Sequence, residues 1–401
     1  MTVLDGRSES PAVRGAAERP DRPRAVNEPY LLLPPEVKRL VTQELPAAAA
    51  ALASVGGTVA ENGDLVLQRG AAVSALSAEL HSTQGISIQR GTAVTELLTG
   101  TNRSPGTPHV RGVLTNSGEA VLGDLIVDAA GRHSAMVKML GEIGALRPLE
   151  EWQDSGSRLY TRHFRPESGT NTWPRWSLRH FAGIRTAVIS DGSGMWSVAL
   201  EIDDADTDLY PLAGPSAWHR AARMYEAAPP RWEGIPWPGV WVTPRVENCY
   251  RRFVLNGRPV ASGTVSIGDA WAATDPILGL GLSMGVLQAL FLRDAARWSA
   301  DVEDIAIQVD RLTETSLTPV YDRVTQWEDR RRVRDSAGPE QASSTADAAD
   351  LVDDLDAGPS ISARNLLTRL AAAETRGTVT TRTGPSRAEL LRTLTSATAT
   401  V

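Results

Sequence analysis

Cysteine, lysine and long apolar runs are scarce in this sequence. Cys249 is the single cysteine of the 401 residues, which excludes an intramolecular disulfide and a metal site built from cysteines. No apolar run reaches the roughly 18 residues of a membrane span, and the N-terminus has no apolar signal core, so we expect a cytoplasmic protein. Lys38 and Lys138 are the two lysines, and we attach no mechanism to the preference for arginine.

The overall composition is that of an ordinary globular protein. Hydrophobic residues make up 42% and charged residues 22% of the chain, and the formal net charge is −7. This acidic balance makes neither nucleic acid nor an anionic membrane an expected partner. A chain of this length buries a full core and is long enough for two or three lobes.

The most informative stretch is 264–298, which predicts a strand, a ligand site and a helix in succession. The strand ends on Gly268-Asp269, and a loop with Pro276, Gly279 and Gly281 then leads into a long apolar helix. A carboxylate at the carboxyl end of such a strand lies where open α/β sheets bind ligands, and it only accepts hydrogen bonds, which suits a polyol. The glycines allow close approach of a flat or anionic ligand, which the first N–H groups of the helix can also meet.

This stretch resembles the "GD" fingerprint of FAD-dependent monooxygenases of the aromatic-hydroxylase type. The residues that carry the resemblance are Gly268, Asp269, Ala270, Pro276, Gly279, Gly281 and Gly285. The resemblance implies that Asp269 binds the ribityl hydroxyls of FAD and that Gly268, Pro276, Gly279 and Gly281 lie around the cofactor. From the residues alone, the alternative is a strand, a turn capped by Asp269 and glycines that serve close packing.

A second motif, Asp124 to Ser134 (DLIVDAAGRHS), predicts a buried strand that ends in a glycine turn. It resembles the D-L-V-V-D-A-x-G-R-x-S signature of flavin monooxygenases and flavin-dependent halogenases, which implies that Ala130 and Gly131 lie close to the flavin. Hydroxylases have Asp-Gly where this chain has Ala130-Gly131. The Asp-Gly motif is linked to the nicotinamide nucleotide in that family, so the departure counts against direct use of NADPH. The resemblance implies NADPH or NADH as electron donor, and a separate reductase is the alternative to direct use.

The N-terminal part resembles the interior of a dinucleotide-binding unit. Residues 2–5 predict a strand that ends in Asp5, and the resemblance implies that Asp5 binds the ribose and that Arg69 lies near the flavin phosphates. From the residues alone, a turn acid and a surface arginine explain the two positions equally well. The G-x-G-x-x-G turn that normally precedes such an acid by about 20 residues is absent. We expect that the natural chain begins upstream of Met1, that FAD binds weakly, or that a partner supplies this unit.

The predicted fold class is α/β, with an N-terminally truncated, Rossmann-like FAD-binding domain at 1–150 and 247–300. Between these parts, 151–246 predicts an antiparallel sheet with one covered face, because tryptophans and other apolar residues alternate with polar ones. The resemblance implies that this sheet is the substrate-binding lobe. Its aromatic and apolar walls would fit a small hydrophobic or aromatic substrate. The segment 301–401 predicts C-terminal helices, with an acidic linker at 336–359.

The remaining predictions concern ordinary helices, strands and side chains without a catalytic role. We expect 31–53 to be apolar and helical after Pro34-Pro35, strands over 86–98 and 110–121, and surface positions for Arg251 and Arg252. The two histidines of the substrate-binding sheet, His163 and His180, are interpreted as hydrogen-bonding residues because no catalytic triad is visible around them.

The function implied by the resemblance is that of an FAD-dependent oxidoreductase, a monooxygenase that acts on a small hydrophobic or aromatic molecule. In such enzymes reduced flavin and O₂ form a C4a-(hydro)peroxide, while the protein positions the substrate and excludes water. One alternative is a truncated or non-catalytic flavoprotein homologue that binds FAD weakly. Another is a flavin-dependent halogenase. Residues Arg231 to Pro236 match only a fragment of the W-x-W-x-I-P signature of that family, and neither lysine of this chain matches its catalytic lysine. No general base and no oligomeric state are predicted.

Overall fold

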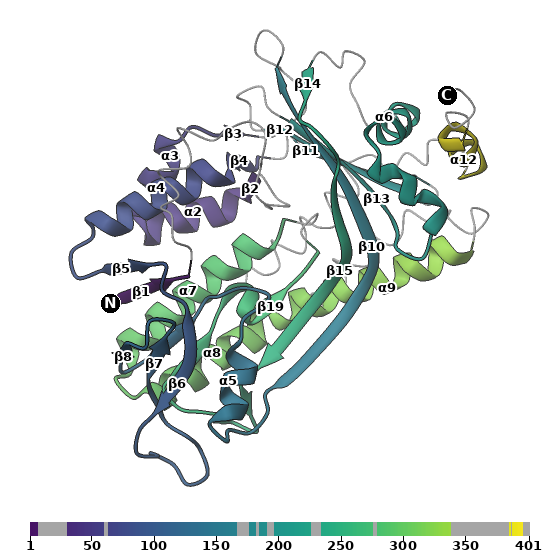
Figure 1. Cartoon of the computed structure of the whole chain (residues 1–401). Helices are drawn as coiled ribbons and strands as arrows, with labels where there is room; N and C mark the ends of the chain where they lie inside the picture. The colour runs from purple at the N-terminus through teal and green to yellow at the C-terminus, as the bar shows by residue number, and fades with distance from the viewer. Residues whose placement is uncertain are drawn as a thin grey trace.

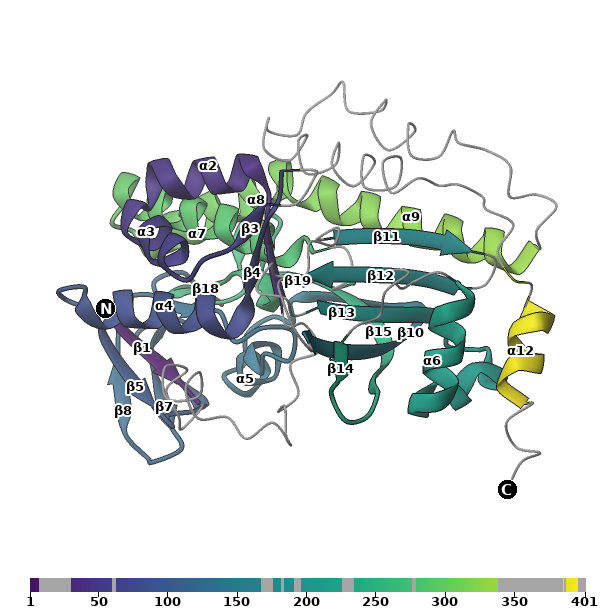
Figure 2. The same ribbon diagram turned by 90° about the horizontal axis from the view of Figure 1, so that it is seen from above.

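The computed structural model describes residues 1–6, 30–59, 63–166, 176–181, 184–190, 196–225, 234–275, 279–337, 385 and 387–395. Two long strands, β10 (Leu149–Pro166) and β15 (Trp241–Arg252), pair antiparallel and run from one lobe into the sheet of the other (Figure 1). The first lobe contains the chain's N-terminus and most of the described helices, and the second lobe contains most of the large sheet (Figure 2). No described helix is both long and apolar enough to cross a bilayer.

The first lobe brings the two sequence motifs together in one parallel strand pair. Strand β9 (Ile126–Asp128) lies beside β18 (Thr264–Ser266), with Asp128 opposite Ser266. The backbone N–H of Ile267 donates to the carbonyl of Asp128 at 2.9 Å. Because the strands are parallel, the glycine turns that follow them emerge at the same edge. A second parallel pair joins β1 (Thr2–Asp5) to β5 (Ser87–Arg90).

Small antiparallel sheets surround these pairs. The predicted strand over 86–98 is instead two strands, β5 and β6 (Val94–Thr99), because Gly91 takes a φ of +69° that breaks the extended backbone. Strand β6 pairs with β7 (Val110–Thr115), which pairs with β8 (Ala120–Leu122). A short hairpin of β16 (Val254–Leu255) and β17 (Arg258–Pro259) leads toward β18.

The helix predicted after Pro34-Pro35 begins there but is divided into two, and the residues before it form a strand. Residues Tyr30–Leu33 form strand β2, which pairs with β4 (Leu65–Gln68), itself paired with β3 (Thr58–Val59). Two helices follow, α2 (Pro35–Glu44) and α3 (Pro46–Ser54). Pro46 separates them because the residue before a proline avoids helical angles, and Leu45 has φ −136° and ψ 61°. Helix α4 (Arg69–Ser82) follows β4 directly.

The large sheet has the order β11–β12–β13–β10–β15–β19, and β14 (Gly234–Pro236) pairs with β10. The remaining strands are β11 (Trp176–Phe181), β12 (Ile184–Ser190), β13 (Trp196–Asp203) and β19 (Ala272–Ala273). One face of this sheet packs on the 3-10 helix η1 (Thr207–Ala213), α6 (Pro215–Met224) and α12 (Arg387–Thr395). The predicted antiparallel sheet with one covered face is therefore present.

The sheet's two faces follow the period-two pattern of a strand. On β13, Val198, Leu200 and Ile202 point into the core with Trp218 and Leu390. The alternate residues Ser197, Ala199 and Glu201 point the other way, toward the first lobe. The sequence pattern thus determines which side chains are available to a site between the lobes.

Four further helices complete the first lobe and its border. They are α5 (Met136–Glu142), α7 (Gly281–Trp298), α8 (Val302–Ser316) and α9 (Thr318–Ala337). The Asp301 side chain caps α8 by accepting from the N–H groups of Glu303 and Asp304. Because α9 continues to Ala337, the predicted linker cannot start at 336, and its remainder, 338–359, lies outside the described residues.

Candidate functional site

A cleft of about 550 Å³ lies where the turns after β9 and β18 and the start of α7 face the large sheet. The first lobe contributes six of the nine residues that the sequence motifs predicted: Arg69, Gly131, Gly268, Asp269, Gly279 and Gly281. The sheet contributes Leu159, Ala187, Ile189 and Ala199. A carboxylate and an apolar wall therefore share one cavity of the size of a cofactor or substrate site.

Three predicted residues are placed differently. Ala130 does not line the cleft, although its neighbours Ala129 and Gly131 do. Asp5 lies at the end of β1, where its carboxylate accepts a hydrogen bond from Arg90 Nη1 at 2.8 Å, and it does not line the cleft. Pro276 lies outside the described residues.

A buried acid that the motif comparison did not single out holds the turn after β9. Asp128 is 7% exposed, and its Oδ1 accepts the backbone N–H of Ala130 at 3.0 Å. Its Oδ2 accepts the hydroxyls of Ser134 at 2.7 Å and Ser266 at 3.2 Å. Asp128 therefore connects both strand ends and fixes the turn in which Gly131 takes a φ of +88°.

The turn after β18 is held from the helix behind it. Gly268 begins the short 3-10 helix η2 (Gly268–Ala270) at a φ of +62°, and its N–H donates to Oε1 of Gln288 at 2.6 Å. Gln288 lies on α7 and is 1% exposed. The side chain of Asp269 is thus presented by a turn whose backbone has a buried partner.

Helix α7 packs closely against this turn, most tightly at Gly281. A Cβ atom added to Gly281 would lie 3.3 Å from Oδ1 of Asp269, and one added to Gly285 would lie 3.7 Å from Cα of Gly268. The expected close packing of this helix face is therefore present. It leaves the N-terminal end of α7 open toward the cleft, where its free N–H groups favour an anion.

The charged groups of the cleft influence one another. Burial raises the pKa of Asp269 above its ordinary value of 3.8, while the guanidinium groups of Arg132 and Arg69 oppose that shift. Arg132 is itself oriented by two backbone carbonyls, those of Glu247 and Thr274, the latter at 3.0 Å. The cleft therefore places the Asp269 carboxylate with two cations near the start of a helix.

Comparison with proteins of known structure identifies this architecture. PqsL of Pseudomonas aeruginosa, a probable FAD-dependent monooxygenase, has a TM-score of 0.57 at 15% identity, covering 82% of this chain and 87% of its own. HpxO of Klebsiella pneumoniae, solved with FAD and uric acid, has a TM-score of 0.57 at 13% identity over 93% of this chain and 96% of its own. The chain has the fold of the FAD-dependent monooxygenases. At these identities the likeness extends to the fold alone.

Comparison by sequence matches a smaller part of the chain. No family model matches the chain. Protein Rv3254 of Mycobacterium tuberculosis is 29% identical over 210 residues, which are 51% of this chain and 44% of the relative. The matched part is thus less than half of that relative's length. The shared fold confirms the predicted α/β class and the type of fold that the two motifs implied.

Within this fold, Arg251 connects the two turns of the cleft. Its guanidinium donates to the carbonyls of Ala270 at 3.1 Å and Arg132 at 2.9 Å, and to Glu150 Oε1 at 2.9 Å. The side chain is 3% exposed, so the predicted surface position is wrong. The neighbouring Arg252 points outward, is 36% exposed and pairs with Asp310 and Glu314. Adjacent residues of a strand face opposite sides, which explains the contrast.

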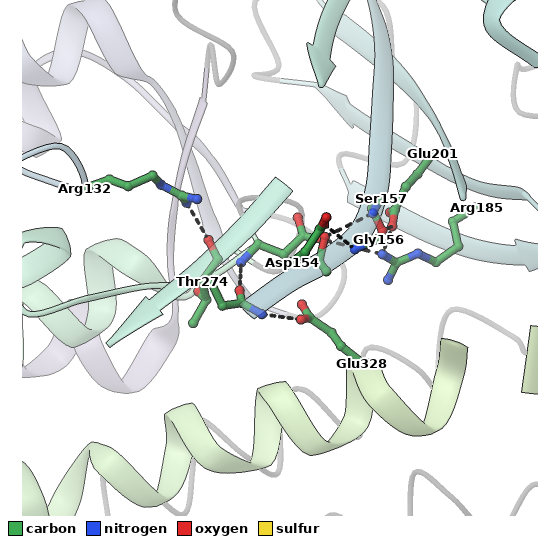
Figure 3. A network of polar contacts seen from close by, with 11 residues as sticks. Arg132, Asp154, Gly156, Ser157, Arg185, Glu201, Thr274 and Glu328 are labelled. Atoms are coloured by element: carbon green, nitrogen blue, oxygen red, sulfur yellow. Dashed lines mark hydrogen bonds and ion pairs between the residues drawn. The ribbon is translucent and has the colours of Figure 1, made fainter. Parts of the chain in front are cut away.

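A second polar network lies under the sheet side of the cleft (Figure 3). Arg185 donates to Glu201 and to Asp275, and Asp275 lines the cleft. Asn248 accepts the backbone N–H of Asp275 at 3.0 Å and donates to Glu328 of α9. These bonds tie the loop before Pro276 to both the sheet and α9, so they position the cleft's floor.

The aromatic residues contribute less to the cleft than the sequence suggested. Trp196 and Trp218 lie in the core on the far face of the sheet, where Trp196 stacks on Phe164 at 5.3 Å between ring centroids. Tyr30 is the aromatic side chain among the described residues of the cleft. The wall is instead built mostly from aliphatic and small side chains.

Replacing Gly279 by alanine is expected to destabilise the chain. Gly279 has a φ of +65°, and an added Cβ would lie 2.7 Å from Cδ1 of Leu32. The left-handed backbone alone costs about 1–2 kcal/mol for a non-glycine residue, and the clash adds to it. The measurement is the free energy of unfolding in urea. Gly70→Ala is the control, because a Cβ there meets nothing within 4 Å; equal losses in both variants would contradict the expectation.

Proposed function

We propose that this chain is an FAD-dependent oxidoreductase, a monooxygenase that oxidises a small hydrophobic or aromatic molecule. The observation that carries the proposal is the composition of the single cleft described above. Its first-lobe side has Asp269, Gly131 and Gly281, and its other side is a largely aliphatic surface of the antiparallel sheet, opposite the face that packs on α6. A cofactor held by the former would therefore meet a substrate held by the latter.

The residues of the first lobe fit FAD on three counts. The Asp269 carboxylate is an acceptor suited to the ribityl hydroxyls, and α7 starts with glycines that leave room beside it. Arg69, Arg132 and the N-terminal end of α7 supply positive potential for the phosphates or for a flavin anion. When bound, FAD would supply the oxygen-activating redox chemistry, with NADPH or NADH as the proposed source of electrons.

The residues of the sheet would orient the substrate and exclude water. Leu159, Ile189, Ala187 and Ala199 form an apolar surface, and their size leaves space for a ring system. Among the described cleft residues there is no lysine, and Lys138 is 79% exposed on α5. The absence of a lysine in this part of the chain favours a monooxygenase over a halogenase.

The rival proposal is a flavoprotein homologue that binds FAD weakly or not at all. The sequence has no G-x-G-x-x-G turn, the element that cradles a pyrophosphate by several charge-assisted hydrogen bonds. The two proposals differ in the affinity for FAD and in what the reduced flavin does with O₂.

Titration of the purified chain with FAD, followed by flavin fluorescence, tests the first point. We expect saturable binding with a Kd below about 100 μM, which corresponds to roughly 5.5 kcal/mol of binding free energy. The bound flavin is then reduced chemically and exposed to ¹⁸O₂ with a panel of phenols and N-heterocycles. A product that carries ¹⁸O supports the monooxygenase. Failure to bind FAD favours the rival, and binding followed only by hydrogen peroxide release refutes oxygen transfer.

A further inference from the structure

A buried serine–histidine pair lies on the sheet side of the cleft. Ser197 of β13 lines the cleft and stands directly opposite His163 of β10 in the strand register. Ser197 Oγ and His163 Nδ1 are 2.6 Å apart, and the two residues are 4% and 6% exposed. The cleft wall around them is largely aliphatic, so this hydroxyl is a defined polar point on an apolar surface.

The surroundings of His163 keep its imidazole neutral. The ring lies against Trp237, with 5.8 Å between centroids, and against Trp241, with 6.0 Å. Burial among these groups lowers the pKa of His163 to about 4. A neutral imidazole either accepts from or donates to the Ser197 hydroxyl, depending on its tautomer. The serine can accordingly donate a hydrogen bond into the cleft or accept one there.

The neighbouring side chains leave this hydroxyl accessible to a flat ligand. Ile189 stands opposite Ser197 on β12, and Ala187, Ala199 and Thr161 form the next row of the same face. All of them line the cleft, and none is aromatic. A ring that lies against the small row would bring a substituent on its edge toward Ser197.

We propose that Ser197, held in place by His163, recognises a hydroxyl or carbonyl oxygen on the substrate. The preferred substrates are then oxygenated rings, such as phenols or cyclic ketones, rather than plain hydrocarbons. This inference rests on the proposed function only in taking the cleft as the substrate site. A site with a built hydrogen-bonding group discriminates against an analogue that lacks the matching group more strongly than an apolar pocket does.

Ser197 is a specificity-determining residue here and His163 a positioning residue. Transfer of a proton from a phenol, whose pKa is about 10, to this imidazole would be unfavourable by about six pKa units, a factor on the order of a million. The pair therefore binds and orients an oxygen atom and does not serve as a general base.

The test compares p-cresol with toluene, which differ by one hydroxyl, in ligand-detected NMR titrations of the chain saturated with FAD. We expect the wild type to bind p-cresol about 5- to 10-fold more tightly, the value of one neutral hydrogen bond. Ser197→Ala should reduce this ratio to about 1 while leaving the Kd of toluene unchanged, and Ser197→Thr should retain it. Thr243→Val, which removes a hydroxyl from another strand of the cleft, is the matched control and should keep the ratio.

The inference is overturned if the two probes bind equally, if neither binds, or if the preference survives in Ser197→Ala. It is also overturned if Thr243→Val abolishes the preference. Uptake of FAD is read in the same samples from flavin fluorescence. A chain that takes up no FAD contradicts the proposed function, yet the ratio of p-cresol to toluene affinity remains measurable on it. The two failures are therefore distinguishable.

Discussion

Replacement of Asp269 by alanine is expected to lower the affinity for FAD on the order of 100-fold. A hydrogen bond to a charged group contributes about 1.5–3 kcal/mol, and a loss of about 2.7 kcal/mol corresponds to a factor of 100 in Kd. Asp269 also borders the start of α7 and interacts electrostatically with Arg132. No other described carboxylate of the cleft lies at this position. The measurement is a fluorescence titration with FAD.

The pH dependence of FAD binding provides a second expectation for the same residue. Burial raises the pKa of Asp269, so its carboxylate becomes protonated, and loses acceptor capacity, at a higher pH than an ordinary aspartate. The wild-type affinity should therefore fall as the pH is lowered through this raised pKa. Asp269→Asn should bind weakly throughout and show no such transition.

Stability should change in the opposite sense to binding. A carboxyl whose pKa is raised by folding opposes folding when it is charged, so its unfavourable contribution grows as the pH rises through the folded pKa. In the absence of FAD, Asp269→Asn should raise the free energy of unfolding at pH 7, and the gain should shrink toward acidic pH. Asp294→Ala on the same helix is the control, because that side chain is 56% exposed. An unchanged FAD affinity in Asp269→Ala would refute the cofactor role.

The positions of the glycine turns were predictable because they follow from strand ends. Asp269 and Gly131 each come directly after a short apolar run, and parallel pairing of β9 with β18 brings these ends to one edge. Alternation predicted that β13 has two different faces, since Ser197 and Ala199 differ in phase from Val198, but it did not show which face meets the cleft: the more apolar face packs on α6 instead. Local patterns were sufficient wherever the structure depends on one strand or one turn.

The supports of these turns were not predictable, because they come from distant segments. Asp128 bonds to Ser266 across 138 positions, and Gln288 reaches Gly268 from the middle of a helix. Nothing in the local sequence distinguishes Arg251 from Arg252, although one is buried and the other half-exposed. At Leu45-Pro46 the proline itself indicates a break in the helix, but the apolar content of the segment favoured one continuous helix.

Arg251→Met is expected to destabilise the chain by about 3–5 kcal/mol, the range for removing one partner of a buried ion pair. The substitution leaves Glu150 without this cation and withdraws a donor from the carbonyls of Ala270 and Arg132. Since these two carbonyls belong to the turns after β18 and β9, their relative position should loosen together with the cleft. We therefore expect weaker FAD binding in variants that still fold.

The control is Arg252→Met, one residue away on the same strand. Its side chain is 36% exposed against 3% for Arg251, and its pairs with Asp310 and Glu314 are only partly buried, so we expect a smaller loss than in Arg251→Met. Urea unfolding of both variants measures the difference, and Arg251→Lys separates charge from geometry, because an ammonium cannot replace the three directed contacts of a guanidinium. Equal losses in the two methionine variants would show that Arg251 does not connect the turns. A stability loss confined to Arg251→Met with unchanged FAD affinity would show that the connection supports the fold but not the cleft.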